Sequence, residues 1–411
     1  MSKTEIPSIR FRGFDDAWEQ RKLGEVIRLN GRIGFRGYTE KDIVTKDDGG
    51  VLTFSPTNIV DNKLTTNCKN TYITRFKYDE SPEIKIHNGD ILFVKTGSTL
   101  GKSALVTGLS EDATLNPQVV VMRTNNLNVE FLAAMLVTNA IISQVNSAKI
   151  GGAVPTLTET RIKDFDVAIP VSEAEKDQIG QFFSQLDHLI TLHQRKFEKL
   201  TNVKKSMLEK MFPKDGADVP EVRFKGFTDA WEQRKAKELF VSTADKGYPE
   251  LPVLSATQDR GMIRRDENSI NIFHDKKNEA GYKRVLPGQF VIHLRSFQGG
   301  FAHSAIEGIT SPAYTVFGFS EPEKHDSEYW KYVFTSKAFI RRLETVTYGI
   351  RDGRSISYDE FLTLSFVYPS RSEQTAIAQY LDKLSNLITL HQCELEKFQN
   401  LKKALLEKMF V

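Results

Sequence analysis

The glycine-rich segment Gly97 to Ser103, GSTLGKS, is the stretch of the chain whose residue types most suggest ligand chemistry. A P-loop needs two glycines separated by four residues and followed by Lys and then Ser or Thr, so that backbone amides and the lysine can hold phosphates. Here Thr96 stands where the first glycine belongs. We therefore reject ATP binding and expect a surface loop after a strand, which either offers polar groups to DNA or is a solvated turn.

Comparable polar loops occur elsewhere, including RSFQGGFAHS from Arg295 to Ser304. Arg suits guanine and Gln suits adenine in base readout. The candidate DNA-binding residues are Ser55, Thr57, Asn58, Lys95, Ser98, Lys102, Ser103, Ser255, Thr257, Gln258, Arg264, Arg265, Arg295, Gln298, His303, Arg351 and Arg354. An ordinary surface position is the alternative for each, and Asp352 could hold the last two in an internal ion pair.

Few patterns in the sequence support a catalytic or metal-binding role. Cys68 and Cys393 are the only cysteines and lack metal-ligand spacing. The amino-methyltransferase tetrapeptide is absent, because Asn116 and Pro117 lead into Gln118 instead of Tyr or Phe. A glycine-rich methyl-donor loop after a strand is also missing. We expect a non-catalytic protein without a metal site.

The elements that position these loops belong to an internal duplication. Residues 6–22, IPSIRFRGFDDAWEQRK, match residues 219–235, VPEVRFKGFTDAWEQRK. Residues 190–212 match residues 388–410, and both copies end in LEKMF. The regions between share a plan of β-type runs, a glycine-rich stretch, an amphipathic helix (residues 129–145 and 328–343), and a strand before Pro170 or Pro369. This order predicts two α+β domains of the same fold with different surfaces. We expect Trp18 and Trp231 to anchor the start of each domain on the helices.

The segments after Pro170 and Pro369 have a heptad pattern that predicts two long helices. Each could span roughly 40 residues and about 60 Å. The predicted seam consists of Phe183, Leu186, Ile190, His193, Phe197, Leu200 and Met207 in the first helix, and Leu381, Leu384, Ile388, His391, Leu395, Phe398 and Leu405 in the second.

Two helices of this length should bury each other, and the chain order makes the pair antiparallel. The repeat is then nearly circular, because the N-terminal segment supplies the continuation that is missing after the second LEKMF. We expect an approximate two-fold axis through the middle of the helical pair. His193 and His391 favour a polar layer that sets the register over a metal site, and Lys204 and Lys402 are expected to extend outward.

The net charge, the cysteine content and the length of the apolar runs agree with this domain organisation. The 411 residues carry a net charge of only +3, so any nucleic-acid binding must use local basic clusters. Two cysteines suit a reducing cytosol, and no apolar run approaches the roughly 20 residues of a membrane span. We therefore expect a cytoplasmic protein.

The alternating repeats, the WEQRK motif, the proline before each long helix and the terminal LEKMF resemble the specificity subunits of type I restriction-modification systems. The resemblance implies two target-recognition domains on double-stranded DNA and helices that bind two methyltransferase subunits. It also implies S-adenosylmethionine, ATP and Mg in partner subunits, including a restriction and translocase subunit.

The expected organisation follows the repeat. It comprises residues 1–22 as a segment completing the circle, 23–170 as recognition domain 1, 171–212 as helix 1, 213–235 as a linker, 236–369 as recognition domain 2, and 370–411 as helix 2. A protein with an approximate two-fold axis and two different recognition domains is expected to bind a bipartite DNA site with unlike halves. The alternatives are a protein scaffold that does not bind DNA and a self-contained methyltransferase.

Overall fold

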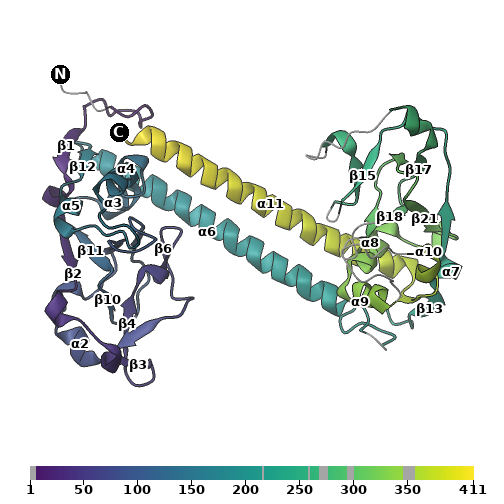
Figure 1. Cartoon of the computed structure of the whole chain (residues 1–411), viewed down its shortest axis with the longest axis horizontal. Helices are drawn as coiled ribbons and strands as arrows, with labels where there is room; N and C mark the ends of the chain where they lie inside the picture. Colours follow the sequence, from purple (N-terminus) through teal and green to yellow (C-terminus); the bar gives the residue numbers. More distant parts are fainter. Residues whose placement is uncertain (1–5, 215–216, 258–259, 268–275, 294–299, 346–356) are drawn as a thin grey trace. The chain divides into compact units, whose positions relative to one another are not determined.

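A computed structural model describes residues 6–214, 217–257, 260–267, 276–293, 300–345 and 357–411 (Figure 1). The chain divides into two compact units, Met1–Gln194 with Cys393–Val411, and Arg195–Gln392. Both divisions fall inside the long helices, four residues after the equivalent positions Ile190 and Ile388. Each unit therefore holds one α+β domain and a part of both helices.

The first unit contains three sheets. A six-stranded sheet has the order β2-β11-β8-β9-β6-β5, a four-stranded sheet has the order β10-β4-β7-β3, and β1 pairs with β12. The strands are β1 (Glu19–Lys22), β2 (Ile27–Gly31), β3 (Ile43–Val44), β4 (Val51–Phe54), β5 (Ile59–Val60), β6 (Lys63–Leu64), β7 (Thr71–Ile73), β8 (Ile91–Val94), β9 (Ser103–Leu105), β10 (Ala113–Leu115), β11 (Val119–Thr124) and β12 (Asp166–Ile169). The short helices are α1 (Leu23–Val26), α2 (Arg75–Asp79), α3 (Val129–Met135), α4 (Asn139–Ala148) and α5 (Glu159–Lys163).

Strand β8 shows why this unit is layered. Successive side chains of a strand point to opposite faces of its sheet. Ile91 and Phe93 pack in the core beneath α3 and α4, whereas Leu92 and Val94 pack in the core shared with the four-stranded sheet. All four are fully buried. A continuous apolar run is therefore required, since both faces of the strand are covered.

The second unit repeats this plan with shorter strands. Its sheets have the orders β14-β21-β18-β19, β15-β16, β17-β20 and β13-β22. The strands are β13 (Glu232–Lys235), β14 (Phe240–Thr243), β15 (Leu254–Ala256), β16 (Met262–Arg264), β17 (Lys283–Val285), β18 (Phe290–Ile292), β19 (Phe301–His303), β20 (Gly308–Thr310), β21 (Thr315–Phe319) and β22 (Ser365–Tyr368). The short helices are α7 (Ala236–Leu239), α8 (Ser327–Thr335), α9 (Lys337–Thr345) and α10 (Tyr358–Phe361).

The single amphipathic helix expected in each domain is two helices. In the first unit Thr138 lies between α3 and α4 in an extended conformation, and its hydroxyl donates to the carbonyl of Met135. In the second unit Ser336 separates α8 from α9, and its hydroxyl accepts from the amide of Phe339. Side-chain bonds of Ser and Thr to nearby backbone compete with the helical ladder. The expectation of one continuous helix was wrong for this reason.

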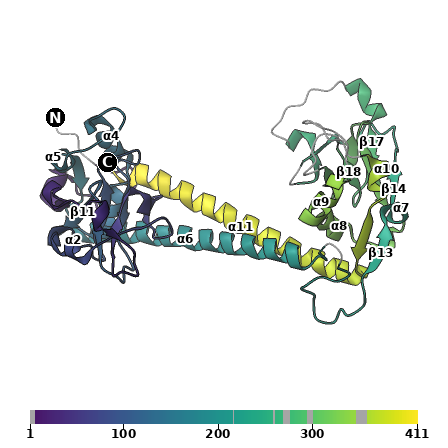
Figure 2. The same ribbon diagram turned by 60° about the horizontal axis from the view of Figure 1, so that its bottom comes forward.

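The two long helices are α6 (Glu173–Lys210) and α11 (Arg371–Met409), of 38 and 39 residues. They lie side by side in both views (Figures 1 and 2). In the first unit both carboxylate oxygens of Asp187 lie 2.7 Å from the Lys402 ammonium. In the second unit Met211 shares a core with Leu381. Since the residue numbers fall along one helix as they rise along the other, the pair is antiparallel, as predicted.

The predicted seam lies inward along both helices. Phe183, Leu186, Ile190, Leu381 and Leu384 are buried. The remaining seam residues are half-buried, namely His193, Phe197, Leu200, Met207, Ile388, His391, Leu395, Phe398 and Leu405. The ring of His193 lies 5.4 Å from that of Phe398. The expectation that Lys402 extends outward was wrong, because its ammonium pairs with Asp187.

The ends of the chain close the repeat in the first unit. The amide of Ile9 donates to the carbonyl of Lys408 at 3.0 Å, and in the second unit the amide of Val222 donates to the carbonyl of Lys210 at 2.9 Å. These two bonds join equivalent residues of the duplication. The N-terminal segment thus completes the first unit as residues 219–235 complete the second, which is the circular arrangement predicted from the sequence.

Equivalent ion pairs fix both junctions. Arg10 donates two hydrogen bonds to Glu175 at 2.6 and 2.8 Å, and Arg223 donates two to Glu373 at 2.7 and 2.8 Å. Both carboxylates are almost fully buried at the start of a long helix. Trp18 is buried in a core with Ile179 of α6, and Trp231 is buried in a core with Ile377 of α11, so the anchoring role expected for the tryptophans is confirmed.

Helix α6 is closely packed against the first domain at Gly180. A Cβ added there would lie 2.5 Å from Oδ1 of Asn128 and 2.7 Å from the amide of Phe131, which together form the N-cap of α3. Gly180→Ala is therefore expected to destabilise the first unit by about 1–3 kcal/mol, because steric strain exceeds the helix propensity gained by Ala.

The measurement is urea unfolding of both variants beside the wild type. Ala378→Gly at the equivalent position, where Ala378 is already buried, is the matched comparison. A more stable Gly180→Ala protein would show that propensity outweighs this contact.

Candidate nucleic-acid interface

The segment GSTLGKS forms the turn of a hairpin between β8 and β9. The amide of Val94 donates to the carbonyl of Lys102, and the amide of Gly101 donates back to Val94, both at 2.9 Å. Gly101 has a φ of +86°, and a Cβ there would lie 2.9 Å from Val145. A strand follows the loop, whereas a P-loop opens a helix. The rejection of a P-loop is therefore supported by the backbone.

This hairpin belongs to a larger edge of the first unit. The amide of Lys95 donates to the carbonyl of Gln118 at 2.8 Å, and the amide of Gly97 donates to the carbonyl of Pro155 at 2.9 Å. Segments 95–102, 116–118 and 150–158 therefore lie together where β8 ends and β11 begins. We call these three segments the polar edge.

The polar edge exposes a few groups suited to nucleic acid. Ser98, Lys102, Gln118 and Thr158 are exposed, and Lys102 has no ion pair among the residues that the structure describes. Lys95 is half-buried and pairs with Glu159 at 3.1 Å, while Ser103 is buried on β9. Gln118 was not among the sequence candidates for binding, although its place after Asn-Pro between two apolar strands marks a loop.

The Ser55 loop adjoins the polar edge, because the amide of Asn116 donates to the carbonyl of Phe54 at 2.9 Å. Asn58 is fully buried and its side chain accepts from the amide of Ser55 and donates to the carbonyl of Thr65. Its role is to hold the loop, so its assignment as a base-reading candidate needs correction. Ser55 is half-buried and Thr57 is exposed, and their contact with DNA stays a prediction.

In the second unit, most of the described DNA-binding candidates are buried or engaged in contacts within the protein. Ser255 and His303 are buried, so neither faces a partner in this structure. The hydroxyl of Thr257 donates to the carbonyl of Gly261 at 2.8 Å, and exposed Arg264 pairs with Asp266. Arg265 is half-buried. The candidates Gln258, Arg295, Gln298, Arg351 and Arg354 lie outside the described residues.

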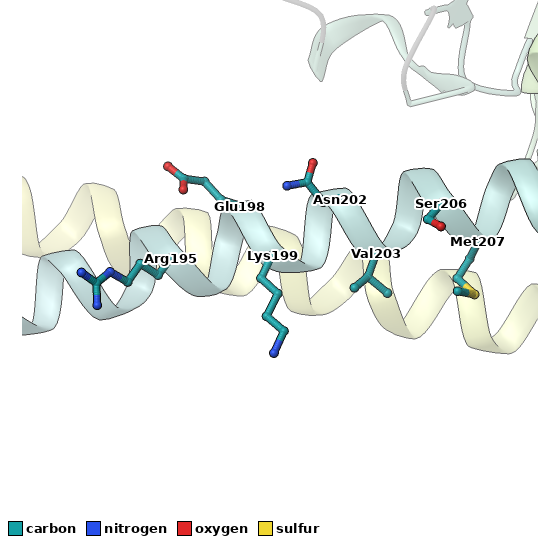
Figure 3. Close-up of a pocket in the computed structure, with 7 residues that line it drawn as sticks. All are labelled: Arg195, Glu198, Lys199, Asn202, Val203, Ser206 and Met207. Carbon is teal, nitrogen blue, oxygen red and sulfur yellow. The ribbon is translucent and has the colours of Figure 1, made fainter. Parts of the chain in front are cut away.

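A shallow groove follows the exposed surface of α6 in the second unit. Figure 3 shows Arg195, Lys199, Val203 and Met207 on one side of the helix, and Glu198, Asn202 and Ser206 on the other. Four leucines are exposed elsewhere on the long helices, namely Leu189, Leu192, Leu390 and Leu401. Apolar groups left open on a helix that already has a partner suggest a further contact surface.

Two further features of the described residues concern metal ions and membranes. Within the described ranges, no group of three or more His, Cys, Asp or Glu side chains could hold a metal ion. Over the same residues, no single helix is long and apolar enough to cross a membrane, and only the bent pair α3 and α4 passes that test when its parts are joined.

Comparisons with known proteins agree with this geometry. Residues 15–202 match the family model described as the type I restriction modification DNA specificity domain. A "type I restriction enzyme MjaVIII specificity subunit" from Methanocaldococcus jannaschii is 24% identical over 406 residues, which cover 95% of this chain and 91% of that protein. Residues 15–202 thus match this DNA specificity domain, and the chain is similar over nearly its whole length to a type I specificity subunit.

Two further relatives extend the likeness. A putative type I restriction enzyme MjaX specificity subunit of the same archaeon is 25% identical over 219 residues, covering 52% of this chain and 48% of that protein. The crystal structure of the type I restriction-modification S subunit from M. genitalium superposes with a TM-score of 0.60 at 12% identity, covering 98% and 99% of the two chains. The latter supports the same fold. The names of these relatives, all specificity or S subunits, agree with the non-catalytic role expected from the sequence.

Proposed function

We propose that this specificity subunit reads a bipartite, asymmetric DNA site, with one half contacted by each unit. The observation that carries the proposal is the duplication of a folded unit whose loops differ between the copies. Asn58 in the first copy stands where the second has Gln258, and GSTLGKS stands where the second has RSFQGGFAHS. Side chains at base edges specify sequence, so unlike loops on like folds predict unlike half-sites.

The long helices would set the spacing of the halves and hold the partner subunits. Two methyltransferase subunits and the restriction and translocase subunit are the proposed partners, and they would bring S-adenosylmethionine, ATP and Mg to a cytoplasmic complex. The exposed leucines of both helices and the groove in Figure 3 support a docking surface on the helices.

The test is reconstitution with a type I methyltransferase subunit from the same organism, followed by mapping of methylated adenines in DNA. The expected result is one motif in two parts separated by unread base pairs. Methylation without a motif would favour a scaffold that does not bind DNA specifically. Binding of S-adenosylmethionine by the isolated chain would favour a self-contained methyltransferase.

Lys102 offers a narrower prediction for the polar edge. If its ammonium contacts a phosphate, Lys102→Ala should weaken binding to every DNA sequence and reduce the slope of log affinity against log salt by about 1. Lys46→Ala is the control, since it removes the same charge from a lysine already paired with Glu111 at 2.8 Å. Fluorescence anisotropy over a salt series measures both. An equal effect of the two variants would remove Lys102 from the interface.

A further inference from the structure

A cavity of about 940 Å³ lies in the second unit, where β19, α8 and residues 260–262 meet the two long helices. Its lining includes Lys204 from α6, Lys331 from α8, and Asp382 and Ser385 from α11. Thr257 and His303, two of the DNA-binding candidates, also line it, but Lys204, Lys331, Asp382 and Ser385 were not among the candidates, and the polar edge lies in the first unit.

Lys204 is the unusual group in this cavity. Its side chain is half-buried, and it makes no ion pair with any acid in the described part of the chain. The ammonium lies 5.7 Å from the ring centre of Tyr332. Burial and the nearby Lys331 lower the pKa of Lys204, although Asp382 opposes this. A partly buried ammonium without a paired anion is unfavourable, so an anion in the cavity would stabilise it.

The duplication shows what the first unit does at the same place. Lys402 is equivalent to Lys204, and its ammonium lies 2.7 Å from both carboxylate oxygens of Asp187. The residue equivalent to Asp187 in the second unit is Ser385, which carries no charge. The first unit therefore supplies its lysine with an internal carboxylate, and the second does not.

The contact between β6 and the long helix in the first unit also has no counterpart in the second unit among the described residues. In the first unit Lys63 at the start of β6 donates to the hydroxyl of Thr191 on α6 at 2.6 Å. Thr389 on α11 is equivalent to Thr191, and it lines the cavity together with Gly261 and Met262. Space that the first unit bridges with its own side chains is thus open in the second.

The acidic groups of the lining are already engaged. The Lys331 ammonium lies 2.5 Å from Glu328 and 3.0 Å from Asp382, and the hydroxyl of Tyr332 donates to Asp382 at 2.6 Å. With Arg260 and Lys204, the described lining residues include three Lys and Arg side chains and only these two carboxylates. The described part of the lining therefore carries one more positive than negative charge.

One ring nitrogen of His303, which also lines the cavity, has no hydrogen-bond partner among the described residues, although the other lies 3.8 Å from Glu328. The side chain of His303 is 6% exposed, and the nitrogen without a partner in the described part of the chain is Nε2. Buried polar atoms are normally satisfied by protein, water or a ligand. The unpaired nitrogen therefore shows that the described residues leave a polar group of this wall unsatisfied.

We propose that the cavity binds a small anionic group, a phosphate or carboxylate, that gives Lys204 the negative charge that Asp187 gives Lys402. The anion has two possible sources, which are a free small molecule and a phosphate of bound DNA. The DNA source rests on the proposed function, whereas the free anion does not.

Thermal unfolding of the full chain in inorganic phosphate, against chloride at equal ionic strength, tests the anion site directly. Phosphate about ten-fold above its dissociation constant should raise the unfolding temperature of the wild type by about 3 °C more than chloride does. The extra rise should vanish in Lys204→Met, which removes the cation, and in Ser385→Asp, which places the carboxylate of the first unit in the second. An equal rise in all three proteins is a general salt effect and would overturn a free-anion site.

Binding to duplex DNA carrying the mapped site distinguishes the two sources. If the anion is a DNA phosphate, Ser385→Asp should weaken binding and reduce the salt slope by about 1, while the charge-matched control Thr201→Asp on the exposed face of α6 should not. Unchanged DNA binding together with phosphate-specific stabilisation assigns the site to a free anion. If Ser385→Asp changes neither measurement, the proposal fails. Wild-type protein that does not bind DNA at all would count against the proposed function and leave the phosphate result standing.

Discussion

Arg223→Ala is expected to destabilise the second unit by about 3–5 kcal/mol, a large share of the stability of an ordinary domain. Arg223 donates two hydrogen bonds to Glu373, whose side chain is only 1% exposed. Removing the guanidinium leaves a buried carboxylate without its counter-charge, and that desolvated charge is the source of the cost. Urea unfolding followed by local hydrogen exchange measures the loss and shows whether it lies in the second unit.

The control is Arg234→Ala in the same unit, where the Arg234 and Glu232 side chains are 43% and 53% exposed. That change should cost at most about 1 kcal/mol, because water replaces the lost partner. The double variant Arg223→Met with Glu373→Met should recover most of the stability, since it removes both charges. A loss below about 1 kcal/mol in Arg223→Ala would show that Glu373 is not dependent on this partner.

Phe410→Ala should unfold the first unit, although Phe410 is the penultimate residue of the chain. Its ring centre lies 5.9 Å from that of Trp18, 5.4 Å from Phe131 and 5.8 Å from Phe183. Loss of a buried phenylalanine from a packed core typically costs about 3–5 kcal/mol. Hydrogen exchange should rise across residues 6–170 and stay near the wild-type rate across residues 236–368.

The equivalent change in the other copy provides the reciprocal test. Phe212 packs against Tyr329 with ring centres 5.5 Å apart, so Phe212→Ala should loosen the second unit and spare the first. Removal of Val411, which is 44% exposed, is the control for shortening the chain and should have little effect. If the amides of the first unit kept their wild-type protection from hydrogen exchange in Phe410→Ala, the end of α11 would not be part of the core of that unit.

The duplicated elements could be predicted from the sequence because matched segments and a heptad pattern constrain them strongly. The repeated WEQRK and LEKMF segments gave the circular closure, and the bonds from Ile9 to Lys408 and from Val222 to Lys210 confirm it. Burial of the seam followed from spacing alone. The break at Thr138 was missed, because a local hydroxyl bond decides it and apolar periodicity continues through it.

Residue-level assignment was harder because it depends on tertiary partners. Asn58 has the right type for base readout, yet the fold uses its amide to hold Thr65 and Asn70. A lysine at the position of Lys402 on the helix usually extends its ammonium into solvent. Here the ammonium instead pairs with the carboxylate of Asp187, which is far away in sequence. The polar edge was recognised only in part, since pairing of β8 with β11 brings Gln118 beside Lys95.

The central claim is that each unit reads one half of a bipartite site, and an exchange of one recognition domain tests it most directly. Residues 236–368 would be replaced by the corresponding region of a relative with a different recognition sequence, and methylated adenines would be mapped after reconstitution with the methyltransferase. We predict that one half of the motif changes while the other half stays as in the wild type. Altered bases in both halves, or no change in either, would contradict it.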